Sequence, residues 1–330
     1  MGKRIKLNDA HGAVARRQVM PANRWAVLLA GGDGVRLLEL TRRISGDCRP
    51  KQFCRLFADK SLFQQTRERI DPLFERNHQV SVLSRAHERF FSDAIAEFAE
   101  SRALVQPDNR GTAVAIALAS LHILSCDPDA MVSVFPCDHY YSDEASFRST
   151  ILWAEDCAVR HPGAIVLVGA EAEYPEADYG WIEPGAMVSQ TGAGPLYRVR
   201  RFWEEPHQRK AAELMRLGCL WNTFVTVGRA RTFLDLLQSQ VPEIVILVAQ
   251  ALAKLGDQGS YDQLPSVDFS RNVLAEESNR LLVLRDCGSG WADLGSPPRV
   301  LDTLTRNGIH PGWVRERSTL SIARSPAVFV

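Results

Sequence analysis

Short apolar runs, separated by turns and by stretches with helical spacing, constrain the fold of this chain more than any other feature. Continuous runs of this kind are typical of strands buried on both faces of a parallel sheet. They lie at Trp25–Ala30, Gln79–Ser84, Ala103–Pro107, Met131–Pro136 and Ala164–Gly169, with helical spacing at Glu88–Glu100 and Thr112–Leu124. This alternation predicts an α/β fold with a Rossmann-like, mainly parallel mixed sheet flanked by helices.

The second half of the chain has a different pattern. The segments "YGWIEPG", "LYRVRRFWEEP" and "LWNTFVTVG" are short and partly alternating, which predicts a small antiparallel insertion or lid against the sheet. Thr232–Leu255 has the spacing of one helix, and Leu281–Leu284 predicts a further strand. The apolar window that begins at Ile244 is far shorter than the roughly 20 residues of a membrane span, so we expect a core helix there.

Composition limits the partners of this 330-residue chain. Lysine plus arginine and aspartate plus glutamate number 39 each, so no net field attracts the protein to nucleic acid or to an anionic membrane. Any phosphate chemistry must therefore depend on local groups. The seven cysteines include no CxxC pair, fit neither a disulfide framework nor a zinc site, and favour a reducing, cytoplasmic location.

The first apolar run ends in "AGGDGVR", a loop that predicts phosphate binding. Glycine permits positive φ and removes side chains that would hold an anion away, so backbone amides can surround a phosphate while Arg36 adds charge. The loop is not a P-loop, because no GK[ST] follows, and Leu37 stands where the third glycine of GxGxxG belongs. A tight turn would explain one or two glycines, but not three with an arginine. The predicted loop residues are Ala30, Gly31, Gly32 and Gly34.

Two further segments carry polar residues towards this loop. Pro50 keeps the chain extended before Lys51, which can then reach phosphates held by the glycines, although a lysine taken alone is usually a solvated surface residue. The stretch "QPDNRGTA" runs from a strand end into a helix, at the sheet edge where open α/β folds bind ligands. Gln106 can bond to the edge of a base through its side-chain amide. Asn109, Gly111 and Thr112 follow it at the same sheet edge. The alternative interpretation of this stretch is an ordinary helix cap formed by Thr112.

Two aspartates are the candidate metal ligands. In "VFPCDHYY" a buried strand ends and exposes Asp138, a hard oxygen ligand suited to Mg²⁺ and substrate phosphates, beside His139, which we interpret as structural. In "GWADLG", Asp293 follows a separate strand. Two carboxylates at neighbouring strand ends can share one Mg²⁺ that bridges two phosphoryl groups, although each alone is more often a turn residue.

From about Trp25 to about Leu304 these segments resemble the sugar-1-phosphate nucleotidyltransferases, and most closely the mannose-1-phosphate guanylyltransferases. The resemblance depends on "LAGGDGVRL", "PKQF", "QPDNRGTA", "FPCDHY", "YGWIEPG", "FWEEP", "LWNTF" and "WADLG" in the family's order. It implies that a sugar 1-phosphate, with mannose 1-phosphate favoured, attacks the α-phosphorus of a nucleoside triphosphate, with GTP favoured. Pyrophosphate leaves and a nucleotide sugar forms, with Mg²⁺ as cofactor. The resemblance also allows a homodimer.

The resemblance also implies roles for individual residues. The catalytic set is Arg36, Lys51 and Asp138; the nucleotide is held by the glycine loop with Gln106, Asn109, Gly111 and Thr112; and the sugar phosphate is held by Tyr179, Gly180, Glu204, Glu205 and Asn222. Asp138 and Asp293 bind the metal. The implied domain plan is a flexible leader at residues 1–23, or upstream sequence before a start at Met20. A catalytic domain follows at 24–305, with its sugar-binding part at about 170–230, and then a C-terminal extension at 306–330.

Three positions depart from the family pattern. Val35 replaces a threonine, Glu39 a proline, and Glu205 the lysine that normally meets the sugar phosphate. At an effective dielectric near 20, a like charge about 4 Å from a phosphate repels it by roughly 4 kcal/mol. Activity then requires another cation, for which the sequence offers Arg200, Arg201, Arg209 and Lys210. A nucleotide- or sugar-nucleotide-binding regulatory protein on the same fold is the alternative function, and unrelated α/β chemistry a third.

Overall fold

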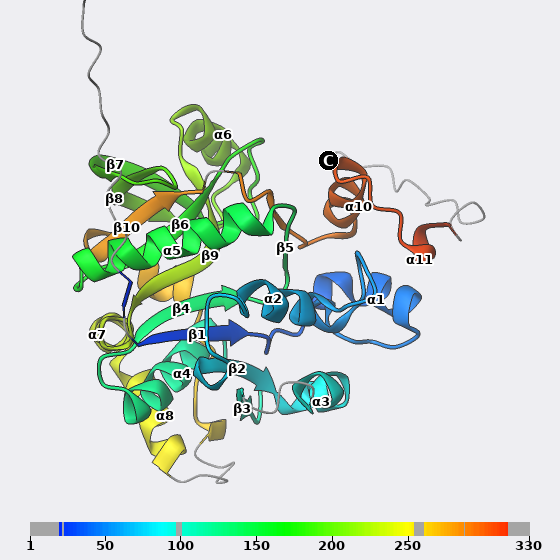
Figure 1. The fold of residues 1–330 in the computed structure, drawn as a ribbon, viewed down its shortest axis with the longest axis horizontal. Coiled ribbons are helices and arrows are strands. Elements are labelled where there is room, and N and C mark those ends of the chain that lie inside the picture. Colours follow the sequence, from blue (N-terminus) through cyan, green and yellow to red (C-terminus); the bar gives the residue numbers. More distant parts are fainter. Residues whose placement is uncertain (1–19, 22, 97–100, 254–260, 287, 316–330) are drawn as a thin grey trace, which may run out of the picture.

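The computed structural model describes residues 20, 21, 23–96, 101–253, 261–286 and 288–315 (Figure 1). Most of the expected leader, and the expected C-terminal extension beyond Arg315, lie outside these residues. Residues 97–100, the last four of the helix expected at Glu88–Glu100, also lie outside the described residues.

A nine-stranded mixed sheet forms the centre of the molecule, in the order β3-β2-β1-β4-β9-β6-β10-β8-β7. Parallel pairs join β1 to β2 and β4, β2 to β3, and β6 to β10, whereas β9 runs antiparallel to both β4 and β6. This confirms the predicted mainly parallel mixed sheet. The strands are β1 (Arg24–Leu29), β2 (Gln79–Ser84), β3 (Arg102–Gln106), β4 (Met131–Pro136), β6 (Ile165–Glu171), β7 (Trp181–Gln190), β8 (Pro195–Trp203), β9 (Leu220–Arg229) and β10 (Leu281–Arg285).

The antiparallel segments predicted after Gly180 are joined to this sheet. The hairpin β7–β8 extends one edge of the sheet, and β9 lies near its middle, because its apolar residues are buried between β4 and β6. A separate two-stranded antiparallel sheet pairs β5 (His139–Tyr141) with β11 (Trp291–Asp293). This short pairing brings the segments after two distant strands side by side.

Helices cover both faces of the sheet (Figure 1). One buried cluster packs α4, α7 and α8 against the sheet, and a second packs α2, α3 and α5 against the other face. The helices are α1 (Leu38–Ser45), α2 (Leu62–Ile70), α3 (Glu88–Ala96), α4 (Thr112–Cys126), α5 (Glu144–Arg160), α6 (Gln208–Arg216), α7 (Ala230–Gln240), α8 (Pro242–Ala253), α10 (Pro297–Arg306) and α11 (Gly312–Arg315). None of the described helices is long and apolar enough to cross a membrane.

The single helix expected over Thr232–Leu255 is wrong: the chain forms α7 and α8, which are separated at Val241. Pro242 has no amide hydrogen and disfavours helical backbone at the residue before it, so one helix ends and the next begins there. The core helix expected from Ile244 is α8, which packs against the sheet with one face. Ile244 and Val248 are buried, but Ile246 is 53% exposed.

The strand order places a topological switch point between β1 and β4. From β1 the chain goes to β2 and β3 on one side, and then crosses to β4 on the other side of β1. Open α/β sheets bind ligands outside the carboxyl ends of the strands at such a point. The glycine loop follows β1 and Asp138 follows β4, so both lie at this point. Beyond it, α1 and α10 share a third apolar cluster.

Candidate functional site

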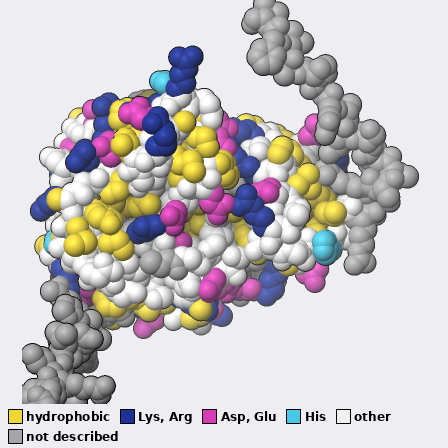
Figure 2. Space-filling model, turned by 90° about the horizontal axis from the view of Figure 1, so that it is seen from above, with side chains coloured by type: hydrophobic (Ala, Val, Ile, Leu, Met, Phe, Trp, Pro, Cys, Tyr) yellow, Lys and Arg dark blue, Asp and Glu magenta, His cyan; other side chains and the backbone are white. Residues whose placement is uncertain are grey.

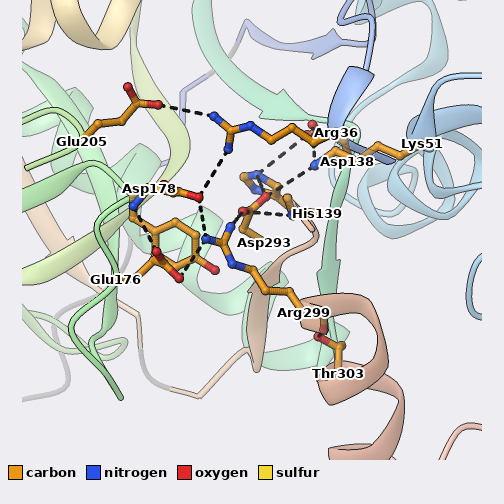
Figure 3. A network of polar contacts seen from close by, with 12 residues as sticks. Arg36, Lys51, Asp138, His139, Glu176, Asp178, Glu205, Asp293, Arg299 and Thr303 are labelled. Carbon is orange, nitrogen blue, oxygen red and sulfur yellow. Dashed lines mark hydrogen bonds and ion pairs between the residues drawn. The ribbon is translucent and has the colours of Figure 1, made fainter. Parts of the chain in front are cut away.

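A cavity of about 540 Å³ opens at the switch point. Most of the residues selected from the sequence line it: Gly31, Gly32, Gly34, Arg36, Lys51, Gln106, Asn109, Gly111, Thr112, Asp138, Tyr179, Gly180, Glu204, Asn222 and Asp293. Ala30 and Glu205 are not among the lining residues. Ala30 is buried beneath the loop, and Glu205 lies beside Arg36 (Figure 3).

Gln52 determines how the glycine loop presents its backbone. Its buried side-chain amide donates to the carbonyl oxygens of Ala30 (3.0 Å) and Gly32 (2.6 Å). Because N–H and C=O of a trans peptide point in opposite directions, the amides that follow these two carbonyls point away from Gln52. Gln52 is not among the site residues predicted from the sequence, although its position directly after Lys51 was a usable signal.

Lys51 brings the two candidate metal ligands together. Its Nζ lies 3.2 Å from Asp138 Oδ2 and 3.4 Å from Asp293 Oδ1 (Figure 3). Burial alone would lower the pKa of Lys51, which is 7% exposed, but attraction to the two carboxylates outweighs it and raises the pKa. Burial would likewise raise the pKa of Asp138, and Lys51 holds it below its ordinary value instead. The lysine is therefore charged, and Asp138 is ionised.

These two carboxylates fit a divalent ion that is completed by phosphate oxygens. Both reach one ammonium group, so their oxygens converge within a volume that one cation can occupy, and oxygen donors are those that Mg²⁺ prefers. Among the described residues, no group of three or more His, Cys, Asp or Glu side chains can hold a metal. A divalent ion held by these two carboxylates would take its remaining ligands from substrate and water oxygens.

His139 lies beside both aspartates and keeps its structural interpretation. Its Nδ1 accepts a hydrogen bond from Trp291 Nε1 at 3.1 Å, across the β5–β11 pairing. Burial lowers the pKa of His139, although Asp138 and Asp293 partly offset this effect.

One half of the cavity is lined by the residues selected for the nucleotide. Gln106 is buried and accepts a hydrogen bond from the hydroxyl of Tyr261 at 2.7 Å, a partner that the sequence did not indicate. Asn109 Oδ1 accepts from the amide of Gly111, while its Nδ2 donates to Asp33 at 3.2 Å. Thr112 does not act as a helix cap. Its hydroxyl donates to Asp268 at 3.1 Å, and Gly111 is the residue before α4.

The other half is lined by the residues selected for the sugar. Tyr179 is buried, and burial raises the pKa of its hydroxyl. Glu204 carries a buried carboxylate oxygen without a hydrogen-bond partner among the described residues. Burial, followed by repulsion from Asp268 and Glu205, raises the pKa of Glu204 to about 8. Since a carboxyl with this pKa is mostly protonated at neutral pH, it can both donate and accept a hydrogen bond.

Glu205 interacts with two arginines at the edge of the cavity. Its carboxylate lies 3.7 Å from Arg36 Nη2 and 2.5 Å from Arg271 Nη2, and its backbone φ is 42°. The four cations suggested by the sequence lie elsewhere: Arg200 pairs with Glu183, Arg201 and Lys210 lie over the Trp203 ring, and Arg209 is exposed on α6. Arg36 and Arg271 are thus the cations that the structure brings to Glu205.

Arg299 is a second residue of the site that was not predicted from the sequence. It lies near the beginning of α10, its side chain is 13% exposed, and it bonds to Asp293 Oδ2 at 2.7 Å and to Glu176 at 2.8 Å (Figure 3). The sequence held no signal for this contact beyond the closeness of Arg299 to Asp293 in "WADLGSPPR".

Comparison with known proteins shows the family to which this fold and this set of cavity residues belong. A family model described as nucleotidyl transferase matches residues 25–306, so the chain belongs to the nucleotidyl transferase family, as its motifs predicted. Mannose-1-phosphate guanylyltransferase of Escherichia coli is 29% identical over 296 residues, which cover 86% of this chain. The alginate biosynthesis protein AlgA of Pseudomonas fluorescens is 30% identical over 283 residues, which cover 82% of it.

A solved structure supports the fold. The protein named mannose-1-phosphate geranyltransferase from Thermus thermophilus superposes with a TM-score of 0.71 at 26% identity, covering 83% of this chain and 76% of that one. The present chain spans 60% of the length of the E. coli relative and 56% of AlgA.

Proposed function

We propose that the protein transfers a nucleotidyl group from a nucleoside triphosphate to a sugar 1-phosphate and releases pyrophosphate. Mannose 1-phosphate is the favoured sugar phosphate, because a relative and a solved structure are named for it, and GTP is the favoured triphosphate, because that relative is named a guanylyltransferase. The observation that carries the proposal is the meeting of Asp138 and Asp293 at Lys51, in the cavity that the glycine loop also lines.

The chain's own residues supply binding and charge in this mechanism. Loop amides, Arg36 and Lys51 bind the triphosphate, and Gln106 with Asn109 lie where a base would contact them. The side chains of Glu204 and Asn222 orient the sugar so that its phosphate oxygen attacks the α-phosphorus in line. This chemistry needs no covalent enzyme intermediate, since positioning and charge stabilisation lower the barrier.

Magnesium is part of the proposal. Asp138 and Asp293 would hold the ion, which would supply Lewis-acid neutralisation of phosphoryl charge. Both carboxylates form ion pairs with the buried Lys51 and keep it charged. The proposed metal ligands are therefore in direct contact with a proposed phosphate-binding cation.

A screen of nucleoside triphosphates against several sugar 1-phosphates with Mg²⁺ tests the activity directly, with pyrophosphate release as the readout. We expect turnover with at least one pair, fastest with GTP and mannose 1-phosphate. A purified, folded protein that releases no pyrophosphate with any pair would refute the proposal.

A regulatory binding protein is the second candidate, and the contacts of Arg36 favour it. Arg36 lies 3.7 Å from both Asp178 and Glu205, so two carboxylates compete with phosphate for this guanidinium. Calorimetry separates the two functions, because a regulatory protein binds nucleotide or nucleotide sugar without turnover.

A further inference from the structure

Arg299 connects the candidate metal ligand Asp293 to the turn that leads into the sugar-binding half of the cavity. We propose that Arg299 is a positioning residue for the sugar phosphate, which holds Asp293 and the turn at residues 176–179 in one arrangement. The inference rests on the proposed function and deepens it. It goes beyond the residues selected from the sequence, because Arg299 lies outside every motif that carried the resemblance.

The contacts of the guanidinium show how the connection is made (Figure 3). Nη1 donates to Asp293 Oδ2 at 2.7 Å, while Nη2 lies 2.8 Å from Glu176 Oε2 and 3.3 Å from Asp178 Oδ2. The guanidinium carbon lies 4.6 Å from the centre of the Tyr179 ring. A planar, forked cation can bond to carboxylates on two sides while its face lies on an aromatic ring, which a lysine cannot reproduce.

On one side, Arg299 fixes the orientation of Asp293. Asp293 Oδ2 accepts hydrogen bonds from Arg299 Nη1 and, at 3.2 Å, from the backbone amide of Gly295. Asp293 Oδ1 lies 3.4 Å from Lys51 Nζ. The two carboxylate oxygens of Asp293 therefore have different partners. Arg299 and Gly295 hold one, so that the other points to Lys51 and Asp138.

On the other side, Arg299 holds a turn through Glu176. The Oε1 atom of Glu176 accepts the amide of Asp178 at 3.1 Å, and its carbonyl oxygen accepts Trp181 Nε1 at 2.8 Å. With Oε2 bound to Arg299, both carboxylate oxygens of Glu176 are engaged. The turn delivers Tyr179 and Gly180 to the cavity wall.

Charge gives the direction of the expected effect. Without the guanidinium, Glu176 would lose its cation, Asp178 would keep only Arg36, and Asp293 would keep only Lys51. Three carboxylates repel one another and also repel an incoming phosphate. Loss of Arg299 should therefore weaken binding of the sugar phosphate more than that of the triphosphate. Arg299 bonds directly to the turn that carries Tyr179, whereas of the triphosphate residues Arg36 meets this turn through Asp178.

Packing of α10 does not depend on this arginine. Val300 and Leu304 of the same helix are buried in the cluster shared with α1, so Arg299→Ala should leave the helix docked. Arg306 provides a matched control on the same helix. It is 51% exposed and pairs with Asp302 at 2.8 Å and with Glu173, away from the cavity.

Hydrogen exchange tests the positioning without any substrate. In Arg299→Ala we expect the amide of Asp178, which is held by Glu176, to exchange about tenfold faster, with little change in Arg306→Ala. Unchanged exchange in Arg299→Ala would overturn the proposed connection.

Kinetics and calorimetry test the consequence for substrate. For Arg299→Ala we expect the KM for mannose 1-phosphate, and its Kd measured without metal, to rise about tenfold while the KM for GTP changes less than about twofold. Arg299→Lys should recover part of the loss, because it restores charge but not the fork. Equal rises in both KM values, or a lower melting temperature with unchanged KM, would make Arg299 merely structural and refute its role.

Failure of the proposed function can be distinguished from failure of the proposed role of Arg299. If the wild type neither binds nor turns over mannose 1-phosphate, the proposed substrate is wrong, whereas the exchange experiment still decides whether Arg299 holds the turn.

Discussion

At the scale of single residues, Glu205 is the departure with the clearest electrostatic consequence. Its carboxylate neutralises part of the charge of Arg36 and Arg271. Glu205→Lys removes that competitor and adds a cation. We expect kcat/KM for nucleotidyl transfer to rise by about tenfold, equivalent to about 1.4 kcal/mol of barrier.

Pyrophosphate release from GTP and mannose 1-phosphate measures this effect. Glu213→Lys is the control, since Glu213 pairs with Lys210 on α6 and is 47% exposed. An unchanged or lower rate in Glu205→Lys would show that residue 205 does not face the phosphates.

Asp138 tests the metal proposal. Asp138→Asn removes one of the two charges that meet at Lys51 but preserves the size of the side chain. We expect Mg²⁺-dependent turnover to fall by at least about 100-fold, on the scale seen when a charge-stabilising group is removed from an active site. Circular dichroism should show the same fold. Kinetics equal to the wild type would exclude Asp138 as a metal ligand.

Glu204 predicts a pH dependence of stability. Folding raises its pKa from 4.5 to about 8, so between these values the folded state binds more protons than the unfolded state. The contribution of Glu204 to stability is therefore complete below about pH 4.5, falls as the pH rises to 8, and is constant above that. A tenfold difference in proton affinity between the two states corresponds to about 1.4 kcal/mol.

Urea unfolding of the wild type and Glu204→Gln at pH 5, 7 and 8.5 measures this dependence. We expect the variant to gain stability relative to the wild type as the pH rises. Glu171→Gln, at a carboxylate that is 71% exposed, should run parallel to the wild type. The assignment fails if Glu204→Gln also runs parallel.

At the scale of elements, Gly111 joins the start of α4 to the segment around Val267. Its φ is 84°, and a Cβ there would lie 2.3 Å from the carbonyl oxygen of Val267, which accepts the amide of Ala113. Gly111→Ala should therefore lower the free energy of unfolding by about 2 kcal/mol or more, because the cost of the strained backbone adds to the cost of the steric overlap.

Urea denaturation measures this cost. Gly163→Ala is the control, because nothing lies within 4 Å of a Cβ at that position. Equal stability of the two variants would mean that the chain near Val267 can move aside.

The bounds of helices and strands could be predicted from the sequence better than the contacts between distant side chains, for a physical reason. Apolar runs and glycines are local signals, so β1, β4 and α4 lie within two residues of their expected bounds. The break at Pro242 was also a local signal, but the apolar spacing on both sides concealed it. In contrast, Tyr261 and Arg299 act through contacts made by folding, which no spacing in the chain encodes. The position of Gln52 beside Lys51 was a local signal, but it did not show that the amide bonds to the glycine loop.

At the scale of the molecule, charge is dispersed over the outer surface and paired in series at the cavity. Positive and negative side chains are interspersed on the face seen in Figure 2, in keeping with equal numbers of basic and acidic residues. At the cavity, an alternating series runs from Arg271 through Glu205, Arg36, Asp178, Arg299, Asp293 and Lys51 to Asp138. Phosphates and a divalent ion would enter this series by exchange with its internal ion pairs, so binding should weaken as salt rises.

The cavity also joins distant parts of the chain, so its ligand should stabilise the whole fold. Its walls come from residues between Leu29 and Gly295, on both sides of the sheet's switch point. GTP with Mg²⁺ at about 100 times its Kd should add about 2.7 kcal/mol to the free energy of unfolding, which raises the Tm of a domain of this size by about 5 °C. Differential scanning calorimetry measures the shift, and Arg306→Ala should show it undiminished. A Tm that stays constant up to millimolar GTP and Mg²⁺ would mean that the triphosphate does not bind in this cavity.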